Sequence, residues 1–182
     1  ADTTAPELDA ILRAGDRAQQ YLAALRSVGT VPAARQHTDS HAFVAALADT
    51  ANALCRPAKL HFVLQEQWQG QFLCAAPELS RALENMLDNA VRYTPAGGTV
   101  TLDVSKTEDT LVFTVTDTGP GFTPEALHKA GQFLYTDAAR PGNGHQGLGL
   151  YLARSVAQAY GGKLVLANTG IGAQAQLCLP MQ

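Results

Sequence analysis

The chain has 182 residues, 46% hydrophobic and 16% charged, which is the composition of one well-cored globular domain with room for a smaller appendage. Its net charge of −3, with 13 scattered lysine and arginine residues, offers no basic face for nucleic acid, so we expect no nucleic-acid partner. Three widely spaced cysteines without a CxxC pair favour neither disulfides nor zinc, and no apolar run reaches the roughly 18 residues of a membrane span. We therefore predict a folded cytoplasmic protein.

The first third of the chain predicts two helices joined by a linker. Apolar residues recur at three- and four-residue steps over residues 6–28, which indicates an amphipathic helix that needs a partner surface. Residues 29–40 contain Gly, Pro and polar residues without a period and predict a linker. A second helix is expected over residues 41–54, with Asp39 or Ser40 as its N-cap. The start lacks the basic and apolar regions of a signal peptide. We expect it to be a cut made inside a longer protein.

The remainder alternates between strand and helix patterns, which predicts an α+β fold. One helix opens at Pro77 and ends before Pro95, and another spans residues 148–160 and is capped by Gly161. Runs with a period of two predict strands: residues 60–64, 71–75, 99–106, 111–117, 163–167 and 173–179. The third and fourth of these runs are joined by a short turn and predict a hairpin.

The helix before Pro95 carries polar residues along one narrow stripe. At 100° per residue, Asn85, Asn89 and Arg92 share this stripe, next to an apolar face. An Asn side chain supplies a neutral carbonyl oxygen that suits Mg²⁺, and Arg92 could reach a phosphate. An Asn pair four residues apart is also common as surface decoration, so the pair alone does not decide between these readings.

A glycine-rich turn follows the strand that ends at Asp117. Gly119 and Gly121 would let a ligand approach the backbone closely, and the carboxylate could accept a hydrogen bond from the exocyclic amine of a base. A simple turn is the competing interpretation.

A second glycine-rich segment opens the helix at residue 148. Gly147 and Gly149 flank Leu148 at this helix start, where N–H groups and the helix dipole favour a phosphate. A single GxG before a helix is weak evidence by itself.

In this order and spacing, the three segments resemble the ATP-binding catalytic domain of sensor histidine kinases, within the wider family of DNA gyrase, the Hsp90 chaperone and the MutL repair protein. ENMLDNAVRYTPAGG resembles the N box, DTGPGF the G1 box, and GLGLYLARSVAQAYGGKL the G2 box with its following helix. The resemblance runs from about Ser40 to the end. It implies a Bergerat-type two-layer α/β sandwich, a mixed sheet with helices on one face, here preceded by an N-terminal helix. ATP would bind between the helices and a mobile lid at residues 122–146.

The resemblance also implies roles for the matching residues and two cofactors, ATP and Mg²⁺. Asn89 would hold the metal, Asn85 would support the metal and the phosphates, and Arg92 would complete the catalytic set. Tyr93 would lie against phosphate, ribose or adenine, and Asp117 would bind the adenine amine. The cofactor-binding positions are Asn85, Asn89, Arg92, Tyr93, Asp117, Gly119, Gly121, Gly147, Leu148 and Gly149.

Several positions depart from the pattern of the family. Tyr135 stands where the kinases often carry an arginine near the γ-phosphate, with Arg140 as the nearby basic residue, and His145 stands where glycine is frequent. The ATPase relatives place a water-activating Glu where this chain has Asn85. Glu84 is adjacent, but its direction differs by roughly 100° around the helix, so we assign it no role as a base.

The phosphate acceptor is expected outside this chain, because none of the five histidines has the H-E-x-R-T-P-like context of a phosphoacceptor. Residues 1–30 resemble the second helix of a dimerisation hairpin, residues 31–40 a linker and residues 41–182 the catalytic domain. The expected partners are ATP, a phosphoacceptor histidine domain, a response regulator and a second copy bound through the N-terminal helix. The whole protein could be the cytoplasmic part of a membrane-bound sensor. The alternatives are a nucleotide-binding module without transfer activity, an ATPase and a serine kinase of the same superfamily.

Overall fold

The structure is a computed structural model that describes residues 34–129, 131–132, 135 and 148–181. The predicted N-terminal helix at residues 6–28 and most of the predicted lid lie outside these residues. Among the helices of the described ranges, none has both the length and the apolar content that a membrane crossing requires.

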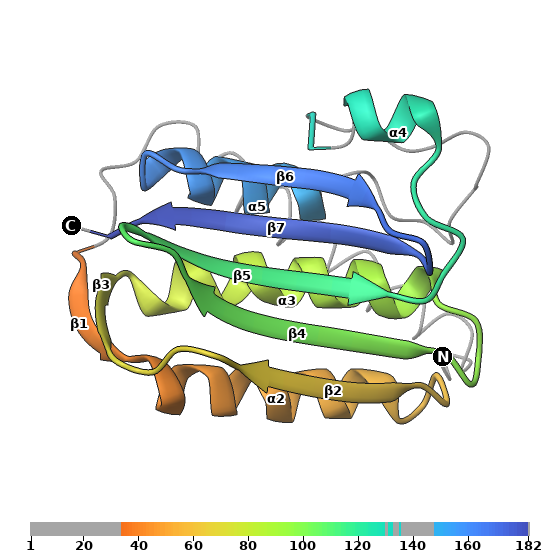
Figure 1. The fold of residues 1–182 in the computed structure, drawn as a ribbon, viewed down its shortest axis with the longest axis horizontal. Helices are drawn as coiled ribbons and strands as arrows, with labels where there is room; N and C mark the ends of the chain where they lie inside the picture. Colours follow the sequence, from red (N-terminus) through yellow and green to blue (C-terminus); the bar gives the residue numbers. More distant parts are fainter. Residues whose placement is uncertain (1–33, 130, 133–134, 136–147, 182) are drawn as a thin grey trace, which may run out of the picture.

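The described chain forms a sheet layer and a helix layer (Figure 1). Helices α2 (Ser40–Cys55), α3 (Ala76–Tyr93) and α5 (Gly149–Ala159) cover one face of the sheet. The five-stranded sheet has the order β2 (His61–Glu66), β4 (Thr99–Lys106), β5 (Thr110–Asp117), β7 (Ala173–Pro180) and β6 (Lys163–Asn168). β2 and β4 are parallel and the other pairs are antiparallel. The predicted α+β fold, with a mixed sheet and helices on one face, is confirmed.

Local signals explain where the helices begin and end. Asp39 caps α2, since its Oδ1 accepts a hydrogen bond from the Ala42 N–H at 2.9 Å. α3 has a proline in its first turn and ends just before Pro95. At the end of α5, Gly161 adopts the left-handed conformation with φ +72°, and the Gly162 N–H bonds to the Ala157 carbonyl at 2.8 Å.

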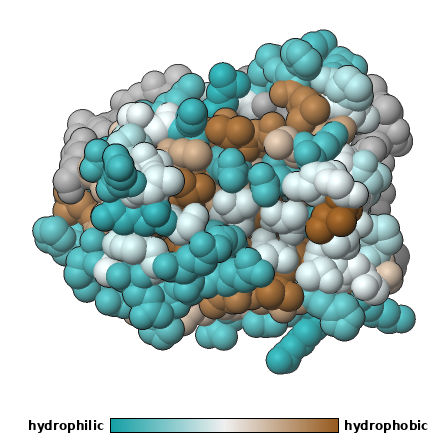
Figure 2. Space-filling view, in the orientation of Figure 1, coloured by the Kyte–Doolittle hydropathy of each residue, from teal (hydrophilic) through white to brown (hydrophobic). Residues whose placement is uncertain are grey.

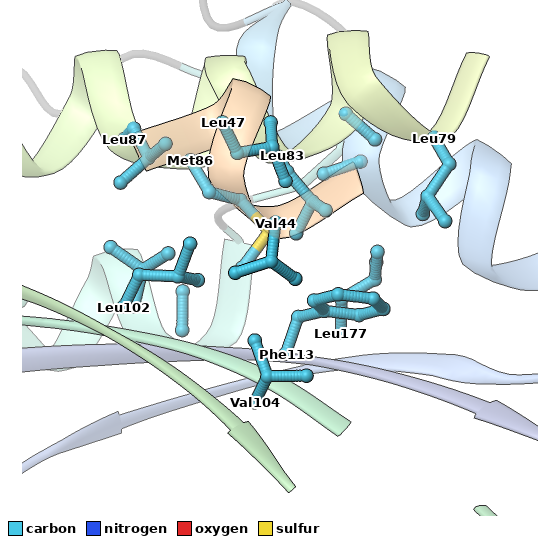
Figure 3. Close-up of a cluster of buried hydrophobic side chains, with 14 of the residues drawn as sticks. Val44, Leu47, Leu79, Leu83, Met86, Leu87, Leu102, Val104, Phe113 and Leu177 are labelled. Atoms are coloured by element: carbon cyan, nitrogen blue, oxygen red, sulfur yellow. The ribbon is translucent and has the colours of Figure 1, made fainter. Parts of the chain in front are cut away.

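The core lies between the two layers. Figure 3 shows Val44 and Leu47 of α2 and Leu83 of α3 pointing towards Phe113 and Val104 of the sheet. Phe43 and Phe113 meet edge to face, with their ring centroids 6.2 Å apart. All these side chains are buried, so the helix layer is fixed against the sheet by apolar packing.

The other face of the sheet turns towards the viewer in Figures 1 and 2 and is mainly polar, with apolar patches between the polar side chains. Threonine side chains of β5 and glutamine side chains of β7 lie on this face and pair across the two strands. Gln174 Nε2 donates to Thr116 Oγ1 at 3.3 Å, and Gln176 Nε2 donates to Thr114 Oγ1 at 3.4 Å. Because one face of the sheet packs on the helices and the other faces solvent, apolar and polar residues alternate along these strands, and this alternation allowed the strands to be predicted from the sequence.

Two short elements differ from the sequence expectation. β1 (Gln36–Asp39) lies in the segment predicted as a linker and pairs antiparallel with β3 (Gln71–Cys74), so backbone pairing and not apolar alternation makes it a strand. α4 (Pro124–Lys129) was not predicted. Thr123 caps it by accepting the Ala126 N–H at 3.1 Å, a signal that the sequence did contain. In Figure 1, α4 lies beyond the β6 edge of the sheet.

Candidate functional site

The site is built around two side chains of α3, Asn85 and Asn89, which we call the amide edge. Both are half-buried beside the core-facing residues Met86 and Ala90. Within the part of the chain that the structure describes, neither carboxamide has a hydrogen-bond partner. Polar groups close to a core are normally paired, so two adjacent amides without internal partners are available to a ligand.

The start of α5 contacts the amide edge. A Cβ added to Gly149 would lie 3.5 Å from Asn85 Oδ1, which is van der Waals contact. Leu148 is buried, occupies the N-cap position and gives no side-chain cap to the helix. The first-turn N–H groups of α5, with the positive end of the helix dipole, therefore lie beside Asn85.

The DTGPGF turn (residues 117–122) packs against the C-terminal end of α3, one turn beyond the amide edge. Asp117 is 5% exposed, and its Oδ1 accepts hydrogen bonds from the Gly119 N–H at 2.8 Å and the Ala173 N–H at 3.3 Å. A Cβ at Gly119 would lie only 2.6 Å from the Tyr93 carbonyl oxygen. Glycine is required at position 119 because the turn packs directly on the end of α3.

Three separate motifs thus meet along one helix. Gly149 faces Asn85 of α3 and Gly119 packs against Tyr93 of α3, and Asn89 lies between these two positions on the helix. These α3 contacts are eight residues apart, or about 12 Å along the helix axis. The structure brings together the site residues expected from sequence that it describes; Gly147, Arg140 and His145 lie outside the described residues.

Arg92 differs from its simplest expected role. Its Nη2 forms an ion pair with Asp88 Oδ2 one turn earlier on α3, at 2.5 Å. The Arg92 side chain is 21% exposed and that of Asp88 is 46% exposed. In this structure the guanidinium is therefore held by a carboxylate of its own helix, and sequence reasoning did not identify Asp88.

Sequence reasoning also missed the β6–β7 turn (residues 169–172). A Cβ at Gly172 would lie 2.0 Å from the Asp117 carbonyl oxygen, so this turn packs against the DTGPGF turn. Thr169 Oγ1 accepts the Gly172 N–H at 3.0 Å and fixes the shape of the turn. The GIG tripeptide was a weak signal, but only the β5–β7 pairing places it beside Asp117.

The donor set is compatible with a hard divalent cation that shares its ligands with a phosphate. No group of three or more His, Cys, Asp or Glu side chains in the described ranges could hold a metal ion. The amide edge offers neutral oxygens, and Mg²⁺ usually takes few protein ligands and completes its shell with waters and phosphate oxygens. The residues present therefore fit a metal that arrives with a nucleotide.

Comparison with known proteins identifies relatives for most of the chain. The family model described as histidine kinase-, DNA gyrase B- and HSP90-like ATPase matches residues 74–182. The sensor histidine kinase SpaK of Bacillus subtilis is 41% identical over 106 residues, which cover 57% of this chain and 23% of SpaK. The adaptive-response sensory kinase SasA of Synechococcus sp. (strain JA-2-3B'a(2-13)) is 37% identical over 110 residues, 57% of this chain and 28% of SasA. The match thus spans about a quarter of each relative.

Solved structures support the fold. The mycobacterial sensor histidine kinase MprB superposes with a TM-score of 0.71 and 23% identity, covering 81% of this chain and 99% of that one. At these identities, the similarity concerns the arrangement of sheet and helices.

Proposed function

Because the chain belongs to the family of histidine kinase-, DNA gyrase B- and HSP90-like ATPases, we propose that it is the ATP-binding catalytic part of a sensor histidine kinase. In this proposal it positions Mg·ATP so that the γ-phosphoryl group passes to a histidine outside the chain. The observation that carries the proposal is the amide edge, Asn85 and Asn89, which lies without internal partners between two glycine segments.

Each end of the site has a proposed task. Asn89 holds the metal through its side-chain oxygen, and Asn85, beside the start of α5, orients the phosphates. The N–H groups at the start of α5 donate to phosphate oxygens. Asp117, whose Oδ1 is already oriented by two backbone N–H groups, receives the adenine amine. Arg92 leaves Asp88 to meet a phosphate.

The chemistry asked of these residues is mainly positioning. An imidazole nitrogen is already a nucleophile, and a loose phosphoryl-transfer transition state spreads charge over the γ oxygens. When bound, Mg²⁺ supplies positive charge that offsets this developing negative charge. The chain contributes fixed amides and helix N–H groups in a geometry that does not have to reorganise during transfer.

The proposed partners follow from this reaction. They are a phosphoacceptor histidine domain, a response regulator that receives the phosphoryl group, and a second copy of the chain bound through residues 1–30. The proposed compartment is the cytoplasm, where the buried thiols of Cys55 and Cys74 remain reduced.

The binding step is tested by Asn89→Ala, with calorimetry of Mg·ATP binding. The variant should lose at least about 100-fold in affinity, since substitutions of residues that only orient a metal ligand already cost about 10–100-fold. Asn52→Ala is the matched control, because Asn52 lies on the exposed side of α2 and its side chain donates to the Ala48 carbonyl of its own helix. An Asn89→Ala variant that binds within twofold of wild type would refute the metal assignment.

The transfer step separates a kinase from a nucleotide-binding regulatory module. The missing arginine at Tyr135 and the irregular G2 box at His145 would allow such a module. ATP labelled at the γ-phosphate is added to the chain together with a phosphoacceptor helix pair. Label on histidine supports the kinase, and bound ATP without phosphohistidine supports the module. Rapid steady-state hydrolysis by the chain alone would instead indicate an ATPase.

A further inference from the structure

One side chain outside the expected motifs forms two hydrogen bonds with the backbone of the DTGPGF turn. Asn168, the last residue of β6, places its carboxamide against Phe122, 46 residues earlier in the chain. Asn168 Oδ1 accepts the Phe122 N–H at 2.6 Å, and Asn168 Nδ2 donates to the Phe122 carbonyl oxygen at 2.9 Å. A single side chain thus satisfies both backbone groups of one residue, as a neighbouring strand would.

Gly121 is the residue that makes room for the Asn168 carboxamide. Gly121 has φ +76°, a conformation that side chains rarely adopt, and a Cβ there would lie 2.8 Å from Asn168 Oδ1. Any larger residue at position 121 would strain the turn and displace the carboxamide. Gly121 therefore leaves the room that Asn168 needs to bind the backbone of Phe122.

Asp117 and Asn168 hold opposite ends of the DTGPGF turn. Asp117 fixes the first half of the turn through the Gly119 N–H, and Asn168 fixes the last residue. The chain then enters α4 within two residues, with Thr123 as its cap. The ends of β5 and β6 lie at the same end of the sheet in Figure 1, so a rigid strand end is available for this purpose.

We propose that Asn168 is a positioning residue of the nucleotide site, which sets the path of the glycine turn beside the amide edge and the entry into α4. The inference rests on the proposed function for its nucleotide readout. It adds a residue that no sequence motif identified, and its effect on the ligand passes through the backbone at Phe122.

The test compares Asn168→Ala and Asn168→Asp with wild type in Mg·ATP binding by calorimetry from pH 4 to pH 8. Asn168→Ala should weaken binding about tenfold at every pH, since two hydrogen bonds of ordinary strength are lost. At pH 8 Asn168→Asp should bind at least as weakly, because its carboxylate faces the Phe122 carbonyl oxygen. As the new carboxyl group becomes protonated towards pH 4, close to the ordinary pKa of an aspartic acid, its O–H can donate to that oxygen and the affinity relative to wild type should rise.

The pH readout separates positioning from general stability. Asp117 and the α4 side chains Glu125, His128 and Lys129 are present in every variant and cancel in the ratio to wild type. The inference is supported if the Mg·ATP affinity relative to wild type stays constant with pH for Asn168→Ala and rises at low pH for Asn168→Asp. The inference would be overturned if both variants bind with wild-type affinity, or if the relative affinity of both variants does not change with pH.

Amide hydrogen exchange distinguishes this inference from the proposed function. Exchange at the Phe122 N–H should accelerate at least about tenfold in Asn168→Ala and remain unchanged in the Asn52→Ala control. If wild type does not bind Mg·ATP but this acceleration occurs, the nucleotide function fails and Asn168 retains only its hold on the turn. An unchanged Phe122 exchange rate would contradict the positioning role itself.

Discussion

The two ends of the α3–α5 helix pair differ in how their polar groups are satisfied. At one end, the buried Tyr160 hydroxyl accepts the Ala75 N–H at 2.6 Å, just before α3 begins. Arg35 lies over the Tyr160 ring, 4.2 Å from its centroid, and donates to the Ala159 carbonyl at 2.7 Å. At the other end, Gly149 meets Asn85, where the amide edge has no partner within the described residues. The closed end holds the helices together, and the open end is left for a ligand.

This contrast implies that stability and binding can be altered separately. The helices run antiparallel, so the closed end lies about ten residues, or roughly 15 Å, from the amide edge along α3. Substitutions more than about 7–10 Å apart without shared partners usually act independently. Variants at the closed end should therefore change unfolding, and variants at the open end should change affinity.

The largest effect is expected from Tyr160→Ala, at the closed end. Removing a buried aromatic ring typically costs about 3–5 kcal/mol of unfolding free energy. Tyr160→Phe keeps the ring but leaves the buried Ala75 N–H without its acceptor, which should cost about 1–3 kcal/mol. Urea denaturation measures both. The affinity of Tyr160→Phe for Mg·ATP should stay within twofold of wild type; a tenfold loss would mean that the two ends are coupled.

A smaller loss of stability, combined with a loss of binding, is expected for Gly119→Ala at the open end. The added methyl group meets the Tyr93 carbonyl oxygen at 2.6 Å and Asp117 Oδ1 at 2.8 Å. Overpacking of this kind costs about 1–3 kcal/mol, and here it also displaces the turn beside the amide edge. Gly170→Ala is the control, since nothing lies within 4 Å of its added Cβ. Equal Mg·ATP affinities in calorimetry would argue against a site at this turn.

Asp88→Asn should change stability and affinity slightly and in opposite directions. Loss of the ion pair with Arg92 removes about 0.2–0.5 kcal/mol of helix stability. Affinity for Mg·ATP should rise about twofold, because a negative charge near the phosphates is gone and Arg92 is released. Calorimetry and thermal unfolding test the two signs. A fall in affinity would show that Asp88 helps to place Arg92 or binds the ligand itself.

The smallest effect is expected away from both ends, where His41 Nδ1 lies 2.8 Å from Glu66 Oε2. The hydrogen bond to Glu66 raises the pKa of His41 above its ordinary value of 6.5. The stabilisation is therefore fully present below that value and is lost as pH rises through the raised pKa. Thermal unfolding of wild type and His41→Ala should differ most near pH 6 and converge towards pH 8. A constant difference would exclude the ion pair as its cause, and Mg·ATP affinity should not follow this titration.

The sequence predicted the elements whose burial pattern is regular. β4 and β5 were predicted nearly to the residue because Val100, Leu102 and Val104 alternate with the polar residues of the open face. β1 could not be predicted in this way, since three of its four residues are exposed and it exists only through pairing with β3. α4 is a single short helix whose Thr-Pro start was outweighed by the surrounding glycines.

The residues of the candidate site also differ in whether a local pattern identifies them. Asn85, Asn89, Asp117 and Gly149 could be found because each belongs to a local motif of fixed spacing. Asn168 and Gly172 could not, because strand order alone brings them to the DTGPGF turn. The roles assigned to the motif residues remain predictions.

The central claim concerns the two carboxamides of the amide edge, and their side-chain NH₂ resonances report on it directly. In a titration with Mg·ATP, the NMR signals of Asn85 and Asn89 should both shift, while the signal of Asn52 stays in place. In a parallel titration with ATP free of Mg²⁺, the signal of Asn89 should not shift. Saturation with Mg·ATP that leaves the Asn85 and Asn89 signals as unchanged as that of Asn52 would contradict the account.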